Sequence, residues 1–343
     1  MGPVDAQKIA VPAVGALHDD PFLRRWSRRF VSFSFVGMAL LVSVVAFPLA
    51  LVHDAIRRRR FSGVRFWAVV IVFLGAELVG LTLAFELWLR RLLGGSEAAY
   101  LDAHYRLQWW WVSTIFEWSR RILDVHVEVE GLDAVEPGPM LLVLRHASLV
   151  DTLLPGHLVS SRLGLKLRYV LKRELVWDPC LDVVGHRIPN AFVQRGGADH
   201  DKDLSAVRAL VEGLGRHEGV LLFPEGTRFS ESRRRRSLEY LEANEPEIHA
   251  LAEPLENVLP PRLGGLFALL DAAPNLHVVF CSHRGLDGIR TFDDLLNGTL
   301  IGRTIAVRFW RYSADTIPTA PAERTRWLYD AWADVDRFVG EAA

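Results

Sequence analysis

The chain has 343 residues, of which 50% are hydrophobic and 24% are charged, with a formal net charge of −1. This length is enough to bury a large core in one or two domains. The net charge argues neither for nor against a nucleic-acid partner, but the lack of a basic-aromatic motif predicts none. The two cysteines, Cys180 and Cys281, follow no disulfide or metal-binding spacing. We therefore expect reduced core thiols in a domain that faces the cytosol.

Two apolar stretches near the N-terminus predict attachment to a membrane. Residues 30–52 are a stretch of 23 residues without a charge. A helix of this length can cross a hydrocarbon core of about 30 Å. Residues 66–89 form a second stretch, interrupted only by Glu77 and Glu86, and carboxylates in such a stretch need a partner or an interface. The expected organisation is therefore a polar segment at 1–29, a membrane helical hairpin at 30–92 and a catalytic domain at 93–343. Two buried core helices are the alternative.

Arginines flank both apolar stretches, since they lie before the first, in the connection and after the second. Positive charge is retained on the cytoplasmic side, so all three flanks favour the same side. A shallow hairpin in one leaflet satisfies this preference, whereas two full crossings must export one basic cluster. We expect the bacterial inner membrane, with the catalytic domain on its cytoplasmic face.

The pattern changes beyond the hairpin. Residues 107–123 predict an amphipathic helix with a tryptophan cluster, which suits either the headgroup layer or a protein core. Short strands then alternate with helices, which is typical of an α/β sandwich with a mostly parallel sheet. The expected strands are 125–130, 140–144, 167–171, 191–193, 220–223, 277–281 and 305–312, and the expected helices are 151–162, 201–217 and 321–339.

The loop after the strand at 140–144 reads RHASLVD and contains His146 and Asp151. On a continuous helix this spacing would turn the two side chains about 140° apart. They can meet if His146 lies in the turn before a helix and Asp151 in its first turn, with Ser148 as the N-cap. A carboxylate on one imidazole nitrogen fixes the tautomer and stabilises the imidazolium, which is how a general base is built. An ordinary loop histidine and helix-start acid are the alternative.

Two further loops at strand ends carry groups suited to an anion. The loop FPEGTR follows the strand at 220–223, where Gly226 permits a turn, Thr227 offers a hydroxyl and Arg228 offers a planar guanidinium for phosphate oxygens. Lys172 and Arg195 each follow another strand and could face one anionic group. Taken singly, each is equally compatible with a charged surface turn.

These elements, taken in order, carry a family resemblance. HASLVD, the segment from Lys172 to Arg195, FPEGTR and VLPPRLGG at 258–265 resemble the four blocks of the glycerolipid acyltransferase family, whose lysophosphatidate acyltransferases carry an HX4D motif. The resemblance covers roughly residues 105–310, and the preceding hairpin is similar to the membrane anchor of that family. The chain departs at Arg145, where the family often has Asn, which affects headgroup preference or histidine geometry. The insert between Arg228 and Pro260, with its arginine run, is more similar to eukaryotic-type members.

The resemblance implies a role for each block. His146 would deprotonate the acceptor hydroxyl with Asp151 orienting it, and the alkoxide would attack an acyl thioester directly, without a serine or cysteine nucleophile. Pro260 and Pro261 would shape the acyl-donor side. The acceptor phosphate would be bound by a set of polar and cationic residues, namely Lys172, Arg195, Glu225, Gly226, Thr227 and Arg228.

The expected function is that of a membrane-bound acyltransferase. It would move a fatty acyl group from acyl-CoA or acyl carrier protein to 1-acylglycerol 3-phosphate, making phosphatidic acid for phospholipid synthesis. We expect membrane lipids, a lysophospholipid acceptor and the acyl donor as partners, with no bound cofactor and no metal. The alternatives are reacylation of another lysophospholipid, a metallohydrolase that uses His146, Asp151 and His157, and a catalytically inactive membrane adaptor.

Overall fold

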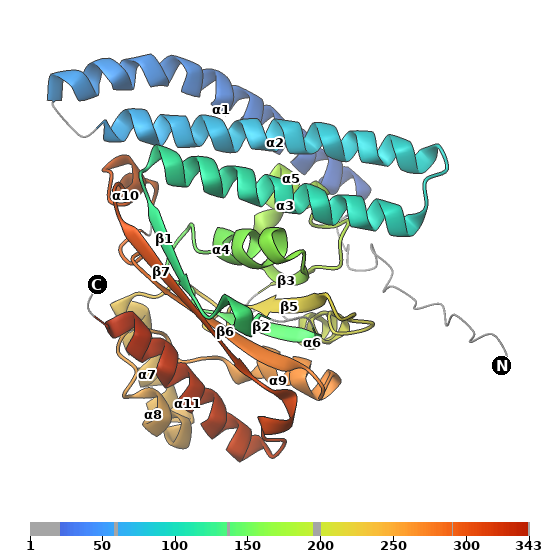
Figure 1. The fold of residues 1–343 in the computed structure, drawn as a ribbon, viewed down its shortest axis with the longest axis vertical. Helices are drawn as coiled ribbons and strands as arrows, with labels where there is room; N and C mark the ends of the chain where they lie inside the picture. The colour runs from blue at the N-terminus through green and yellow to red at the C-terminus, as the bar shows by residue number, and fades with distance from the viewer. Residues whose placement is uncertain (1–20, 58–60, 136–137, 195–199, 290, 342–343) are drawn as a thin grey trace.

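The computed structural model describes residues 21–57, 61–135, 138–194, 200–289 and 291–341. Three long helices come first and lie on one side of a central sheet (Figure 1). They are α1 (Phe22–Arg57), α2 (Ser62–Leu92) and α3 (Glu97–Ile122). Since α1 begins before the apolar stretch, its first turns contain the arginines of the expected polar segment, and residues 1–20 of that segment lie outside the described residues.

A seven-stranded sheet forms the centre of the molecule, in the order β1-β7-β6-β2-β5-β3-β4. Every neighbouring pair is parallel except β6 and β7. This confirms the expected α/β fold with a mostly parallel sheet. The strands are β1 (His126–Glu130), β2 (Met140–Leu144), β3 (Lys166–Lys172), β4 (Ala191–Val193), β5 (Glu218–Leu222), β6 (His277–Arg284) and β7 (Thr304–Tyr312).

Shorter helices connect the strands and close the chain. The α-helices are α4 (Leu153–Pro155), α5 (Pro179–Val183), α6 (His200–Ala209), α7 (Glu231–Asn244), α8 (Pro246–Ala252), α9 (Leu263–Ala272), α10 (Phe292–Leu296) and α11 (Pro321–Gly340). The short helical turns are η1 (Leu132–Ala134), η2 (Gly156–Ser161), η3 (Arg173–Trp177) and η4 (Ala314–Thr316).

Two expected helices differ from the structure. The helix at 151–162 is not continuous, because α4 begins only at Leu153 and gives way to the π-helical turn η2. Pro155 lies at that junction and has no backbone N–H to donate to the preceding turn. The helix expected at 201–217 ends at Ala209, and the chain then turns through Gly213 at a positive φ of 61°, a conformation that glycine adopts readily.

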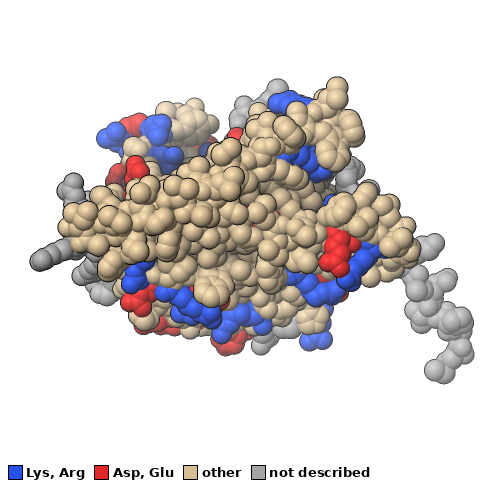
Figure 2. Space-filling view, turned by 90° about the horizontal axis from the view of Figure 1, so that it is seen from above, with Lys and Arg blue, Asp and Glu red and all other residues tan. Residues whose placement is uncertain are grey.

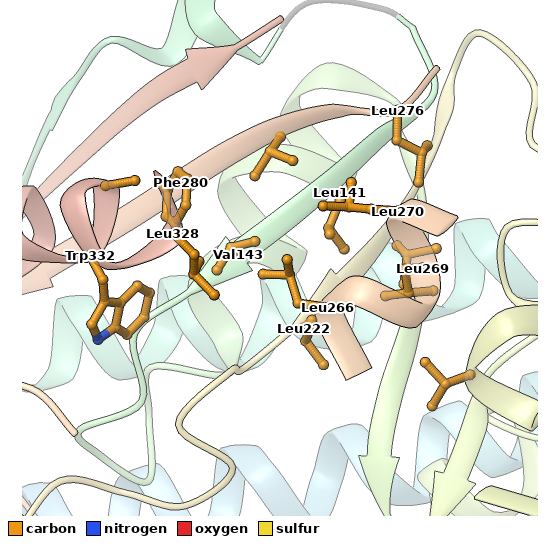
Figure 3. Close-up of a cluster of buried hydrophobic side chains, with 14 of the residues drawn as sticks. Leu141, Val143, Leu222, Leu266, Leu269, Leu270, Leu276, Phe280, Leu328 and Trp332 are labelled. Atoms are coloured by element: carbon orange, nitrogen blue, oxygen red, sulfur yellow. The ribbon is translucent and has the colours of Figure 1, made fainter. Parts of the chain in front are cut away.

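Two hydrophobic cores lie on opposite faces of the sheet, and β2 contributes to both because side chains alternate along a strand. Leu141 and Val143 belong to the core with α9 and α11 (Figure 3). Leu142 and Leu144 belong to the core with α3, α4 and η2. As a result α1, α2 and α3 lie on one side of the sheet, whereas α7, α8 and α11 lie on the other (Figure 1).

The outward surface of α1 and α2 is apolar. Figure 2 shows a broad area without charged side chains that has Lys, Arg, Asp and Glu at its borders. Large apolar side chains exposed on α1 include Phe30, Phe35 and Met38, and both helices are long and apolar enough to cross a membrane. This surface is unusual for a water-soluble face, where extended apolar patches are rare.

The opposite side of α2 is built into the domain. Glu77 is fully buried and accepts hydrogen bonds from Trp111 Nε1 at 2.9 Å and from the Cys180 N–H at 3.0 Å. Glu86 is paired with Arg90 at the exposed end of the helix. Both carboxylates of the apolar stretch therefore have the partners that the sequence predicts they need.

The start of α1 is fixed to the domain by ion pairs. Arg28 Nη2 lies 2.9 Å from Asp182 Oδ1, and Arg29 Nε lies 2.7 Å from Asp182 Oδ2. Asp182 is on α5 and is buried. Burial raises the pKa of Asp182, but a hydrogen bond with His186, the hydrogen bond and charge of Arg29 and the charge of Arg28 outweigh it and hold the pKa well below its usual range. The helix is thus held along the domain at its first turns.

The sheet also sets the position of the candidate site. β5 and β6 run parallel to β2, and β3 and β4 run parallel to β5. The loops that follow these five strands therefore open at one edge of the sheet, which is where parallel α/β sheets usually bind ligands. RHASLVD, FPEGTR and Lys172 all lie at this edge.

Candidate active site

His146 and Asp151 meet in the loop that follows β2. Nδ1 of His146 lies 3.1 Å from Oδ1 and 3.2 Å from Oδ2 of the Asp151 carboxylate. The carboxylate is fully buried, whereas the His146 side chain is 15% exposed. The Phe223 ring packs against the imidazole with its centroid 4.8 Å away. Asp151 therefore holds one ring nitrogen, and the opposite nitrogen, Nε2, is the one left to accept a proton.

Asp151 also organises the loop itself. Its Oδ2 accepts hydrogen bonds from the backbone N–H groups of Ala147 at 2.6 Å and Ser148 at 2.8 Å. The N-cap role expected for Ser148 is wrong, because its hydroxyl donates to the Ile289 carbonyl at 3.0 Å and α4 is preceded by Thr152. The backbone of this loop is therefore fixed by the Asp151 carboxylate, and not by a Ser148 hydroxyl that caps the following helix.

A second histidine lies behind Asp151. His283, on β6, is fully buried, and its Nε2 is 3.2 Å from the Arg145 carbonyl oxygen and 3.5 Å from Asp151 Oδ2. Burial raises the pKa of Asp151, but hydrogen bonds with His146 and His283 outweigh this effect and hold the pKa well below its usual range. Asp151 is therefore ionised at neutral pH. No local sequence signal marks His283, which lies beyond the expected end of its strand at 281.

Glu225 joins the FPEGTR loop to the histidine loop. Its Oε2 accepts from the His146 N–H at 2.6 Å, and its Oε1 accepts from the Leu259 N–H at 2.9 Å. Burial raises the pKa of this carboxyl to about 8. With both oxygens engaged by the backbone, the geometry gives Glu225 a linking role instead of the expected contact with phosphate. Gly226 then turns the chain at a φ of 69°, which favours glycine.

The remaining residues expected to bind phosphate are distributed along the same edge. Arg228 is half-buried in the loop after β5, and Lys172 ends β3, the neighbouring strand. Thr227, with Pro260 and Pro261, lines an open cavity next to this loop. Arg195 lies outside the described residues. Lys172 thus lies at the end of β3, and Arg228 lies in the loop that follows the adjacent strand β5.

Arg145, the residue that departs from the family pattern, is directed into the protein. It is 1% exposed, and its Nη1 donates to the His283 carbonyl at 3.0 Å. Its Nη2 donates to the Asn257 carbonyl at 3.0 Å and to Asp287 Oδ1 at 2.6 Å. Of the two consequences expected from this departure, the geometry therefore favours support of the histidine loop over direct contact with a headgroup.

His157, the third residue of the metallohydrolase alternative, is held elsewhere. On η2 it stacks on Phe116, and its two ring nitrogens face Ser113 Oγ and Glu117 Oε1, each at 3.2 Å. Within the part of the chain that the structure describes, no group of three or more His, Cys, Asp or Glu side chains could hold a metal ion. His146 and Asp151 are accompanied by His283 and not by His157.

Comparisons with known proteins point to the same family as the sequence motifs. Residues 126–282, which contain both motif loops, match the protein-family model described as Acyltransferase. The fold is similar to the crystal structure of the 1-acyl-sn-glycerophosphate (LPA) acyltransferase PlsC from Thermotoga maritima, with a TM-score of 0.54 and 14% identity over 83% of this chain and 98% of that one. A search of the curated proteins found no match.

Proposed function

We propose that this chain, an enzyme of the acyltransferase family, transfers a fatty acyl group from an acyl thioester to the free hydroxyl of 1-acylglycerol 3-phosphate. The observation that carries this proposal is the buried Asp151 carboxylate on His146 Nδ1, at the sheet edge that also holds Lys172 and Arg228. The similarity in fold to a protein named as an LPA acyltransferase supports the choice of acceptor. The product is phosphatidic acid, a precursor of phospholipids.

The reaction begins at His146. Its Nε2 takes the proton from the acceptor hydroxyl, and the ionised Asp151 stabilises the resulting imidazolium. The alkoxide oxygen bonds to the thioester carbonyl carbon, the carbon–sulfur bond breaks, and the leaving thiolate takes the proton back from His146. Arg228 and Lys172, with Arg195 from beyond the described residues, bind the acceptor phosphate and so position the hydroxyl.

The apolar hairpin brings the enzyme to its lipid acceptor. We place α1 and α2 in the cytoplasmic leaflet of the bacterial inner membrane, with their apolar outer surface in lipid and the site on the cytoplasmic side. Three features support this placement: the apolar face in Figure 2, the arginines in the first and last turns of the hairpin, and the ion pairs that hold α1 along the domain. An amphipathic unit of this kind lies in the membrane plane.

Labelling of the hairpin connection tests this placement. Phe61 is 48% exposed between the two helices, and we expect Phe61→Cys in intact cells or right-side-out vesicles to react with an impermeant maleimide only after permeabilisation. The native Cys180 and Cys281 are buried and free, so the unsubstituted protein gives the background. Labelling of Cys at 61 before permeabilisation would establish two crossings instead.

An acceptor panel tests the reaction itself. Purified full-length protein receives labelled oleoyl-CoA with lysophosphatidate, lysophosphatidylcholine, lysophosphatidylglycerol or glycerol 3-phosphate. We expect the highest kcat/KM with lysophosphatidate, because a phosphate monoester offers more charge to two or three cations than a phosphodiester does. Preference for another lysophospholipid would establish a remodelling enzyme, and no turnover with any acceptor would support the inactive adaptor.

A substitution of His283 tests whether this residue helps to hold Asp151 in place beside His146. We expect His283→Leu to lower kcat roughly 10-fold while leaving KM for both substrates unchanged, because it removes a hydrogen bond to an ionised group. His283→Gln can still donate to the Arg145 carbonyl and should retain most of the rate. If both variants lose the same activity, and the loss follows the decrease in thermal stability, His283 contributes only packing and does not support Asp151.

A further inference from the structure

The four arginines at 233–236, at the start of α7, make different contacts. Arg234 donates to the backbone carbonyls of Leu255 and Glu253, and so fixes α7 to the end of α8. Arg235 is exposed and pairs with Glu239 at 3.7 Å along its own helix. Arg233 and Arg236 are three residues apart, which places them on one face of the helix.

Arg233 and Arg236 face a cavity with a third cation. The cavity has a volume of about 720 Å³, and Arg262, from the segment after Pro261, also lines it. Tyr240 is 60% exposed and adds an aromatic surface. Glu245 also lines the cavity, as does the buried Glu225, so the three guanidinium groups outnumber the carboxylates. The volume is in the range of small-ligand and cofactor sites.

The cavity adjoins the catalytic loop on the side away from the membrane helices. α7 and α8 lie on the opposite side of the sheet from α1 and α2 (Figure 1). One wall is formed by Glu225 and Leu259, and the same Glu225 carboxylate bonds to the backbones of His146 and Leu259. A ligand in the cavity is therefore separated from bilayer lipid but lies next to the residue that would activate the acceptor.

We propose that this cavity binds the phosphorylated nucleotide part of a coenzyme A thioester, which makes acyl-CoA the donor. Coenzyme A carries a diphosphate and a 3′-phosphate, and guanidinium groups recognise such oxygens by charge-assisted hydrogen bonds. Tyr240 offers a ring for the adenine, and Thr227 and Pro260 line the same cavity beside Glu225, which bonds to the His146 backbone. This inference rests on the proposed acyl transfer and adds the identity of its donor.

A protein-bound donor fits the same surface less well. An acyl carrier protein presents only one phosphodiester, and the rest of its contact would be a protein surface, on the order of 800 Å² per partner for a stable complex. Here the three arginines line a concave space instead of an open face. A membrane lipid is a poor occupant as well, since α7 and α8, which contribute to the cavity lining, lie on the far side of the sheet from α1 and α2.

Binding of adenosine 3′,5′-bisphosphate, measured by calorimetry on the full-length protein in detergent, tests the site without turnover. Two charge-assisted contacts are lost in the double variant Arg236→Ala with Arg262→Ala, so we expect Kd to rise at least about 10-fold. Arg235→Ala removes a cation from the same run outside the cavity and should leave Kd unchanged. Equal binding by the double variant and the unsubstituted protein would overturn the proposal.

Donor kinetics separate this inference from the proposed function. With lysophosphatidate as acceptor, the double variant should raise KM for oleoyl-CoA at least about 10-fold but leave S-oleoyl-pantetheine, which lacks the nucleotide, unchanged. If the protein binds the nucleotide but transfers no acyl group, the proposed function is rejected and the nucleotide-binding cavity is retained. A higher KM for oleoyl-acyl carrier protein alone, without nucleotide binding, assigns the arginines to a protein donor and rejects the inference.

Discussion

His146→Ala is expected to lower kcat by at least about 10²- to 10⁴-fold, the usual contribution of a positioned general base. The imidazole is the group that Asp151 holds at 3.1 Å, and alanine leaves no base to take the hydroxyl proton. The measurement is the initial rate of transfer from oleoyl-CoA to lysophosphatidate. Because His146 is partly exposed and its backbone N–H still bonds to Glu225, we expect the fold and vesicle binding to be retained.

Asp151→Asn is the matched variant for the same assignment. The amide oxygen must take the place of Oδ2 to accept from Ala147 and Ser148, which turns the NH2 group toward His146. Nδ1 must then accept, so the ring proton moves to Nε2 and the base is lost. We expect a loss nearly as large as that of His146→Ala. If His146→Ala keeps more than about a tenth of the rate, the general-base assignment is wrong.

Short-range patterns in the sequence predict all seven strands, but they do not predict the connecting helices α5, α7, α8, α9 and α10. β2 is a run of five apolar residues and proves to be buried on both faces, and β4 and β2 have the expected limits. The spacing also allows His146 and Asp151 to meet, although Asp151 lies before α4, which begins at Leu153, and not in the first turn of a helix as expected. These features depend on neighbours within a few residues, which a single sequence displays.

Other parts of the site depend on contacts between distant segments. His283 reaches Asp151 because β6 lies next to β2 and continues beyond the expected end at 281. Glu225 faces His146 and Leu259 only because three loops meet at one edge of the sheet. The sequence shows no partner for Arg145, yet its guanidinium donates to carbonyls of β6 and of the segment before Pro260. Periodicity and motif spacing contain no information about such partners.

Arg228 carries the second large prediction, which concerns the acceptor phosphate. A guanidinium aimed at phosphate makes charge-assisted, bidentate hydrogen bonds that lysine cannot reproduce. Arg228→Lys should therefore lose activity although it keeps the charge, and Arg228→Ala should lose about 10- to 150-fold in kcat/KM, from roughly 1.5–3 kcal/mol for such a contact. The contact from Arg233 to the backbone carbonyl of residue 228, at 2.9 Å, does not need the side chain and should persist.

The division of the loss between KM and kcat identifies the substrate that Arg228 contacts. A contact that is equal in the ground and transition states raises only the KM for lysophosphatidate, whereas a contact that aligns the hydroxyl with His146 also lowers kcat. We expect both, because a displaced acceptor misaligns the reacting hydroxyl. Arg236→Ala is the reciprocal control, since it should change the KM of the donor alone. If Arg228→Ala weakens the acyl donor and leaves acceptor kinetics unchanged, Arg228 belongs to the thioester side, and Lys172 and Arg195 must bind the acceptor phosphate without it.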